Sequence, residues 1–307
     1  MLSLFNRLIS PANAHAFWIG IIFMVLGNFF FALNDTMGKI LVGTFAVSQV
    51  LAIRSIGAFL VLGPMLWAGR SVGRIDRPWL QLVRVGVATG DTALFYAAVA
   101  YLPLADVFTF YMAGPIYVAA MSSFLPGGGV GWRRWLAILA GFAGVVIALG
   151  PSVTVYSPGI LYALAGSFCY AGALMMNKVL VKTSDTALAT LQALGALVGG
   201  GVFAAFQWTP PSVVDVGLLL LLGIVACLAH LMISRSVKLT PVSVLAPFQY
   251  SLLLWGIGFG LLVFGDVPNE RTLLGAAIIT AAGLFLLYSE SRSRRRMRAD
   301  ALIKDFP

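Results

Sequence analysis

Hydrophobic residues in this chain gather in long runs that short polar links separate. A helix needs about 20 mostly apolar residues to cross the hydrocarbon core of a bilayer. Ten runs approach or exceed that length, and the links between them carry Gly and Pro residues, which end helices and start turns. The pattern therefore predicts an all-α integral membrane protein with ten transmembrane helices, at residues 16–39, 45–68, 79–101, 104–125, 132–150, 158–181, 187–208, 215–236, 241–264 and 271–289.

Composition supports this interpretation and excludes other classes of protein. Hydrophobic residues make up 60% of the 307 residues and charged residues 10%, whereas a soluble domain carries about 25% charged residues. The chain is therefore neither a soluble enzyme nor a disordered protein. Its two cysteines, Cys169 and Cys227, lie inside apolar runs, where they are expected to act as small buried hydrophobic side chains.

The net charge of +9 comes from Lys and Arg residues in short clusters between the apolar runs. Nucleic acid is not an expected partner, because its binding needs a basic face. The expected partner is the lipid bilayer. Cytoplasmic loops of membrane proteins are rich in Lys and Arg, and placing both termini in the cytoplasm puts most of the 20 basic residues there. We therefore expect a multi-pass protein of the cell inner membrane, with residues 291–307 as a basic cytoplasmic tail.

The sequence also matches itself. Laying the chain on itself in one register places Gly27 on Gly166 and Lys39 on Lys178, in the first and sixth predicted spans. The third and eighth spans match in a nearby register, with Leu94 on Leu231. Chance explains matches among Leu, Ala and Gly as well as a repeat does, but Lys is rare in the spans. The match favours an internal repeat.

The repeat predicts two halves, residues 1–151 and residues 152–290, with five helices each. Because five is an odd number, the second half enters the membrane from the side opposite to the first. Such inverted-topology repeats are typical of secondary transporters, in which a central site opens alternately to each side.

Several landmarks resemble the drug/metabolite transporter superfamily, in its EamA branch. They are the "LPLADV" and "LTPVSV" entries to the fourth and ninth spans, the "VFGDVP" exit of the ninth, and the Gly-rich fifth and tenth helices around Gly144 and Gly283. The resemblance covers nearly the whole chain. Within the branch the sequence is most similar to YddG-type aromatic amino-acid exporters, which implies transport of amino acids through a central cavity.

One feature departs from the common pattern of this branch. A Glu-Pro pair often stands in the fourth and ninth spans, but here the positions hold Gly114 with Pro115 and Ser251 with Leu252. A mechanism that depends on a carboxylate at those places is therefore not expected.

Ionisable side chains inside a membrane are costly and mark functional sites. Arg54 and Asp91 are both expected near mid-depth, and two interpretations remain open. They form a structural pair that tethers two helices, or Asp91 is a titratable carboxylate in the transport pathway. Coupling to protons and uncoupled facilitated transport are equally compatible with the sequence.

Polar residues also gather at the outer end of the first span, where Asn34, Asp35 and Lys39 lie. The spacing puts Asp35 and Lys39 on one helix face. Asn34 and Lys39 are candidate substrate contacts, although a lysine at a helix end also snorkels to the headgroups. His230 in the eighth span is interpreted as a hydrogen-bonded packing residue rather than a proton relay.

Aromatic residues in the middle of the spans suit a substrate with a ring and a zwitterionic head, because Tyr combines an apolar face with a polar edge. Most such residues in membrane helices only pack, so a minority are expected to touch substrate. Two prolines, Pro115 and Pro247, are predicted hinges in the fourth and ninth spans. The remaining predicted substrate-binding residues are Tyr96, Phe108, Tyr111, Tyr170, Gln249 and Tyr250.

No Gly-rich phosphate loop, metal-ligand spacing or nucleophile elbow occurs in the sequence, so we expect no cofactor, no resident metal and no enzyme activity. The hypothesis is a secondary transporter that exports amino acids, aromatic ones included, by alternating access, as a monomer or a homodimer. One alternative is an exporter of drug-like or toxic amphiphiles. Another, of a different class, is a membrane-embedded enzyme or scaffold.

Overall fold

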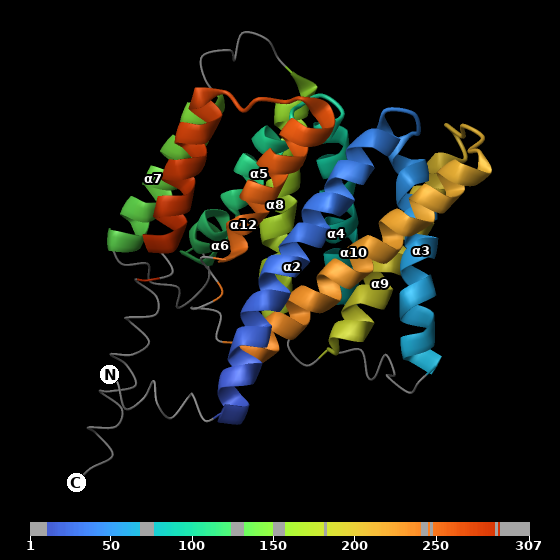
Figure 1. Ribbon diagram of the computed structural model, residues 1–307, viewed down its shortest axis with the longest axis horizontal. Coiled ribbons are helices and arrows are strands. Elements are labelled where there is room, and N and C mark those ends of the chain that lie inside the picture. Colours follow the sequence, from blue (N-terminus) through green and yellow to red (C-terminus); the bar gives the residue numbers. More distant parts are fainter. Residues whose placement is uncertain are drawn as a thin grey trace.

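The computed structural model describes residues 11–67, 77–123, 132–149, 157–180, 183–240, 245, 248–285 and 288. These residues form helices and short connections, without a strand among them (Figure 1). The helices are α2 (Pro11–Val42), α3 (Val47–Trp67), α4 (Pro78–Val99), α5 (Leu104–Met112), α6 (Gly114–Ser123), α7 (Trp132–Leu149), α8 (Pro158–Val179), α9 (Asp185–Ala204), α10 (Val213–Leu239), α12 (Ser251–Phe259) and the π-helical η2 (Gly260–Phe264), followed by a helix over residues 270–285.

Each predicted span contains a helix, and within the described residues six of the helices are long and apolar enough to cross a membrane. These six are α2, α3, α4, α8, α9 and α10. The fourth predicted span is divided at Ala113 into α5 and α6. The ninth contains α12, which continues into the wider turn of η2. Crossing of the membrane by all ten spans stays a prediction.

Local sequence explains where several helices begin. α4 and α8 each begin with a proline, which has no amide hydrogen to leave unpaired in the first turn. The Ser184 side chain caps α9 by accepting a hydrogen bond from the Ala187 amide. Ser212 and Asp215 form a reciprocal capping box at the start of α10.

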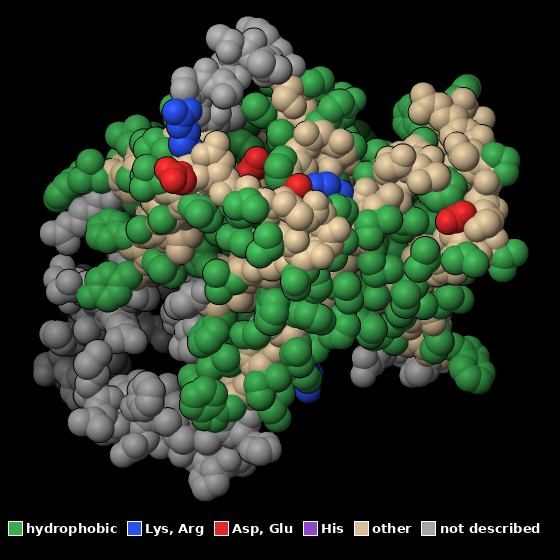
Figure 2. Space-filling model, turned by 45° about the horizontal axis from the view of Figure 1, so that its top comes forward, with side chains coloured by type: hydrophobic (Ala, Val, Ile, Leu, Met, Phe, Trp, Pro, Cys, Tyr) green, Lys and Arg blue, Asp and Glu red, His purple; other side chains and the backbone are tan. Residues whose placement is uncertain are grey.

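The surface is as apolar as a membrane environment requires. Many large hydrophobic side chains are exposed, among them Trp67 at 93% and Leu262 at 82%. Figure 2 shows hydrophobic side chains over much of the face it presents, with few charged groups. Because soluble monomers rarely expose contiguous apolar patches of more than a few hundred Å², this surface fits lipid rather than water.

Two helix pairs form the centre of the bundle: α2 packs along α10, and α4 packs along α8. Glycines allow the close approach. Gly27 of α2 faces Ile233 of α10, and Gly166 of α8 faces Leu94 of α4. The two contacts are equivalent in the repeat, because the register that lays Gly27 on Gly166 also lays Leu94 on Ile233.

This packing corrects the register predicted for the third and eighth spans. Leu94 corresponds to Ile233 by its contacts and not to Leu231. A second pair of contacts agrees, since Gly20 faces Thr240 while Gly159 faces Tyr101. Identical aliphatic residues had produced a chance match two positions away, whereas close packing at a glycine identifies the true neighbour.

The two ends of the bundle differ. The Lys39 end is defined by Lys39, the last turn of α2, and the Thr183 end by Thr183, just before α9. Near the Lys39 end the core is dense, with Tyr96, Leu104 and Phe108 each 1% exposed or less. Here Gln49 of α3 also holds the link before α10, through hydrogen bonds in both directions with the Thr209 backbone.

Two further glycines allow close packing against side chains of other helices. Gly256 of α12 lies against the Phe108 ring, and Gly195 of α9 lies against Val85 of α4.

Candidate functional site

A cavity of about 580 Å³ lies among α2, α3, α4, α8, α9 and α10. It extends from Arg54 and Asp91, in the middle of their helices, to Thr183 and Leu188 at the Thr183 end. Its volume is in the range typical of small-molecule sites, about 300–1,000 Å³. Aromatic, amide and charged side chains share the wall, so the cavity is suited to a polar molecule with an apolar part.

Arg54 of α3 and Asp91 of α4 both line this cavity. The Arg54 Nη1 atom donates a hydrogen bond to the Tyr96 hydroxyl at 2.9 Å, and the guanidinium lies 5.4 Å from the centre of that ring. The Tyr111 hydroxyl donates to Asp91 Oδ1, also at 2.9 Å. Arg54 and Asp91 do not form an ion pair with each other among the described contacts. The predicted tether is therefore not seen, and each charged group has a tyrosine hydroxyl as its partner.

A buried polar network continues behind Arg54. The Asn34 Nδ2 atom donates to Asp35 Oδ1 at 2.8 Å and to the Tyr96 hydroxyl at 3.4 Å. Asn34 Oδ1 is buried and has no hydrogen-bond partner. The sequence had suggested that Asp35 lies at a helix end, but α2 continues to Val42, so Asp35 is part of this internal network.

Lys39 lies outside the cavity wall. Its Nζ atom forms an ion pair with Asp266 Oδ2 at 2.9 Å and lies 4.4 Å from the centre of the Phe264 ring. The side chains of the pair are 16% and 26% exposed. The charge predicted to contact substrate or headgroups is thus paired inside the protein, where it connects the end of α2 to the link after η2.

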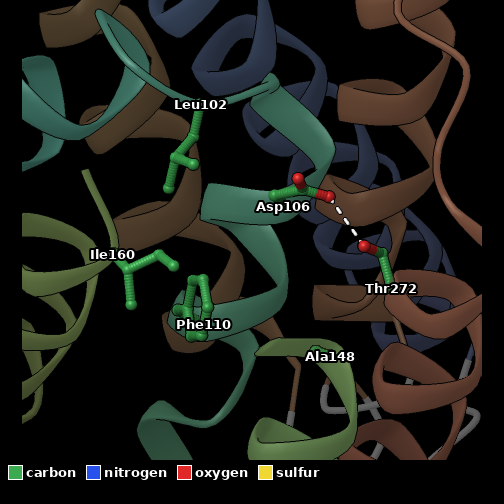
Figure 3. Close-up of a pocket in the computed structure, with 6 residues that line it drawn as sticks. All are labelled: Leu102, Asp106, Phe110, Ala148, Ile160 and Thr272. Atoms are coloured by element: carbon green, nitrogen blue, oxygen red, sulfur yellow. Dashed lines mark hydrogen bonds between the residues drawn. The ribbon is translucent and has the colours of Figure 1, made fainter. Parts of the chain in front are cut away.

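A second contact at the Lys39 end joins Asp106 of α5 to Thr272, whose hydroxyl donates to Asp106 Oδ1 at 2.8 Å (Figure 3). The two side chains border a small pocket of about 70 Å³. A water molecule occupies about 30 Å³ in the liquid, so this pocket is too small for a metabolite. Together with the Lys39–Asp266 pair, the contact closes this end of the bundle.

The predicted aromatic contacts divide into two groups. Tyr111, Tyr170 and Tyr250 line the cavity, and the rings of Tyr111 and Tyr170 are 5.8 Å apart. Tyr96 and Phe108 are 0% and 1% exposed and lie behind the wall, as Asn34 does.

The other predicted residues are placed as follows. The Gln249 side chain is exposed to the cavity. Pro115 is the second residue of α6, just after the interruption between α5 and α6, but its side chain lies outside the described residues. Pro247 lies outside them altogether.

His230 and Phe31 were not predicted as substrate contacts, yet both line the cavity. Their rings meet edge to face, 4.7 Å apart. A histidine without an acidic neighbour in the sequence gave no signal, and Phe31 is one of three consecutive phenylalanines whose orientation only packing decides.

Arg84 is the main residue that sequence reasoning missed. It is 4% exposed and joins three helices. From α4 its Nε atom donates to Asn177 of α8, and its Nη atoms donate at 3.3 Å to the Leu188 carbonyl and to Gln192 Oε1 of α9. One turn earlier, Gln81 donates to the Thr183 hydroxyl at 3.0 Å. A signal was present in the sequence, because Arg84 lies inside the predicted span 79–101.

Within the described residues, no three His, Cys, Asp or Glu side chains come together as a metal site would require. The arrangement is instead a cavity with a guanidinium, a carboxylate and aromatic rings in its wall. Such a cavity can bind an organic molecule that bears both charges.

Comparison with known proteins identifies relatives over most of the chain. An S-adenosylmethionine uptake transporter of Rickettsia bellii (strain RML369-C) is 27% identical over 279 residues, covering 90% of this chain and 95% of that protein. A riboflavin transporter of Rhizobium johnstonii is 28% identical, covering 91% and 94%. A pseudopaline exporter of Pseudomonas aeruginosa is 25% identical, covering 87% and 95%.

A protein of known crystal structure shares the fold, with a TM-score of 0.61 and 18% identity over 91% of this chain and 98% of its own. The three relatives described above are not specifically the YddG-type aromatic amino-acid exporters that the sequence had suggested. The EamA-like transporter family matches the chain twice, over residues 18–150 and 157–289. The protein therefore belongs to the EamA-like transporter family and is a multi-pass membrane transporter, not an enzyme.

Proposed function

We propose that this protein is a secondary transporter of amino acids and amino-acid-derived metabolites, aromatic ones included. One observation carries the proposal: Arg54 and Asp91 line the same cavity without pairing with each other. Their charges are opposite, and each is held by a tyrosine hydroxyl, which is neutral. A zwitterion supplies a direct ionic partner to each of the two groups in one molecule.

The energetics favour this assignment. An unpaired charge inside a membrane protein costs several kcal/mol, and an opposite charge from a ligand removes most of that cost. The ammonium group of an amino acid is matched to the Asp91 carboxylate, and its carboxylate to the Arg54 guanidinium. A ligand that bears one charge leaves the other protein group uncompensated and is expected to bind more weakly.

The relatives are compatible with this class of substrate without identifying it. S-adenosylmethionine contains an amino-acid head and a planar ring, and the corresponding relative takes it up. Relatives named for uptake and for export both match this chain. We propose export for this chain, in the direction of the relative that is named for export.

The proposed mechanism is alternating access in ten spans, arranged as two inverted halves with both termini in the cytoplasm. In that topology the Thr183 end is cytoplasmic and the Lys39 end is external. The cavity extends to the Thr183 end, while packing and the Lys39–Asp266 pair close the other. The conformation is then the inward-facing state, from which a cytoplasmic substrate is loaded.

Uptake of labelled phenylalanine into liposomes that contain the purified protein tests the proposal. We expect uptake by the unmodified protein, and a loss of about tenfold or more in Asp91→Asn and in Arg54→Gln, because each variant removes a buried countercharge. Glu270→Gln and Arg271→Gln are matched controls, since both residues are exposed; they should transport normally.

The rival function, export of drug-like amphiphiles, predicts a different result. In that case liposomes take up a cationic dye such as ethidium but no amino acid, and the Arg54 variant transports as well as the unmodified protein. That outcome would replace the amino-acid proposal.

A further inference from the structure

The cavity wall contains residues that correspond to one another across the two halves of the chain. The two ranges matched by the family run in parallel, with residue 18 equivalent to residue 157 and residue 150 to residue 289. The same register relates the packing contacts of α2 with α10 to those of α8 with α4. Applied to the residues that line the cavity, it pairs Phe31 with Tyr170, Arg54 with Ala193, Ala88 with Cys227, Asp91 with His230, and Tyr111 with Tyr250.

One of these pairs places an aromatic ring on each of two corresponding helices. Phe31 belongs to α2, which packs along α10, and Tyr170 belongs to α8, which packs along α4. The two rings therefore reach the cavity from different helix pairs, Phe31 from the first half of the chain and Tyr170 from the second. A flat molecule bound between these helix pairs has an aromatic side chain available from each.

Both rings are supported by a neighbour. Phe31 meets the His230 ring at 4.7 Å and 87°, and Tyr170 meets the Tyr111 ring at 5.8 Å and 46°. Tyr170 also lies against Gly114, where a side chain would be in tight contact with the ring. Aromatic side chains held in this way lose little conformational entropy when they bind a ligand.

We propose that Phe31 and Tyr170 form a ring subsite that holds the planar aromatic or heteroaromatic part of the substrate between them. The inference rests on the proposed function for the head group, which Arg54 and Asp91 bind. It adds which residues select the rest of the molecule. His230, beside Phe31, provides ring nitrogens for the polar edge of a heteroaromatic ring.

The correspondence between the two residues gives the subsite a use in transport. In alternating access between inverted repeats, each half takes over the arrangement of the other. A ring held between corresponding positions therefore keeps similar contacts before and after the change. A ring held by one half alone would lose its contacts at every turnover.

Transport competition tests the subsite with two amino acids that share a head group. Tryptophan has a planar ring and leucine has none. We expect Phe31→Leu and Tyr170→Leu each to lower the apparent affinity for tryptophan by about three- to tenfold, which corresponds to the loss of one aromatic contact. The apparent affinity for leucine should change less than about twofold, because an aliphatic side chain makes no specific contact with a ring face.

One further variant serves as a control. Phe203→Leu changes a phenylalanine that is 68% exposed on α9 and should change neither substrate. Equal losses for tryptophan and leucine would show that the two residues only support the fold, and an effect at one position alone would exclude a subsite with two faces.

Failure of the ring subsite can be separated from failure of the proposed function. If the unmodified protein transports no amino acid, the head-group proposal fails, and riboflavin binding to purified protein in detergent tests the ring subsite by itself. Phe31→Leu and Tyr170→Leu should each lower the affinity for riboflavin by a similar factor. Unchanged riboflavin affinity in the variants would overturn the subsite, as would the absence of binding of both riboflavin and tryptophan to the unmodified protein.

Discussion

At the scale of single residues, the tyrosine hydroxyls explain how a charged cavity exists inside an apolar bundle. Tyr96 is fully buried, and its hydroxyl accepts hydrogen bonds from Arg54 and Asn34. The Tyr111 hydroxyl holds Asp91 in a similar way, by donating a hydrogen bond to its carboxylate. A neutral partner orients a charged group without cancelling its charge, so both charges remain available to a ligand.

Tyr96→Phe removes the acceptor for Arg54 while the ring remains in the core. We expect a loss of stability of about 1–3 kcal/mol, because buried donors lose their partner, together with a higher KM for phenylalanine, because the guanidinium is no longer oriented. Thermal unfolding in detergent and liposome uptake measure the two effects. Tyr101→Phe is the control, since Tyr101 is 59% exposed; a normal KM in Tyr96→Phe would contradict the role given to this hydroxyl.

Sequence reasoning reached the cavity more easily than the details of its wall. Arg54 and Asp91 stand out because charge is rare in the spans, and the structure places both in the wall. Phe108 and Tyr111 are close neighbours in α5, yet Phe108 faces Gly256 and Tyr111 faces the cavity. Rotation of a short helix decides this difference, and the hydrophobicity of neighbouring positions does not reveal it.

At the scale of helices, glycines decide which pairs approach closely. Gly223 of α10 lies against the backbone of Arg54 in α3, and Gly57 of α3 lies against the backbone of Leu220 in α10. No side chain fits between the two backbones at these points. The α3–α10 contact therefore belongs to the closed part of the bundle, next to the cavity.

Gly223→Ala is expected to destabilise the protein by about 1–3 kcal/mol, because the added methyl group meets backbone atoms that cannot rotate away. The melting temperature of the purified protein in detergent measures the loss. Gly217→Ala, in the same helix α10, is the matched control, since a methyl group there has open space. It should melt at the same temperature or slightly higher, as expected for Gly→Ala within a helix; equal melting of both variants would contradict the packing described here.

Arg84 has a comparable role at the Thr183 end, where it connects α4 with α8 and α9. Arg84→Ala leaves three acceptors without their donor, so we expect a loss of about 2–3 kcal/mol in stability, within the range for charged hydrogen bonds. Thermal unfolding in detergent tests this, with the exposed Arg235→Ala as control. An unchanged melting temperature for Arg84→Ala would mean that the three contacts contribute nothing to stability.

The positions of the helices followed from the sequence, but some interruptions did not. Long apolar runs identify helices because bilayer thickness fixes their length. The interruption at Ala113 lies just before Gly114 and Pro115. Proline disfavours the helical conformation in the residue before it, so the signal was present. The register that relates the third and eighth spans could be determined only from packing contacts. Aliphatic residues match one another by chance in a sequence comparison, but each has its own neighbours in the structure.

At the scale of the whole molecule, the two ends differ in how they are closed. Among the described residues, Lys39 and Asp266 form the one ion pair between side chains. It lies at the end of the bundle that the cavity does not reach. In the proposed topology, opening to the outside breaks this pair. The pair then stabilises the inward-facing state relative to the outward-facing one.

Lys39→Gln should therefore shift the population toward the outward-facing state. Cys227 lines the cavity and is a free thiol, so its labelling reports access. In cells that express a Cys169→Ala background, we expect a membrane-impermeant methanethiosulfonate reagent to label Cys227 faster in Lys39→Gln than without it. Arg271→Gln is the control. Equal labelling rates would remove the pair from the mechanism, and restoration of slow labelling by Lys39→Asp with Asp266→Lys would support it.

The correspondence within the cavity wall is one of shape more than of charge. Arg54 stands opposite in the repeat to Ala193, and Asp91 to His230. Turning an amino acid end for end would bring its carboxylate to a methyl group and its ammonium to an imidazole. In the proposed mechanism the molecule therefore keeps one orientation while it crosses, and the end that enters last also departs last. A carrier whose frame is nearly symmetrical thus gains a polarity from two substituted side chains.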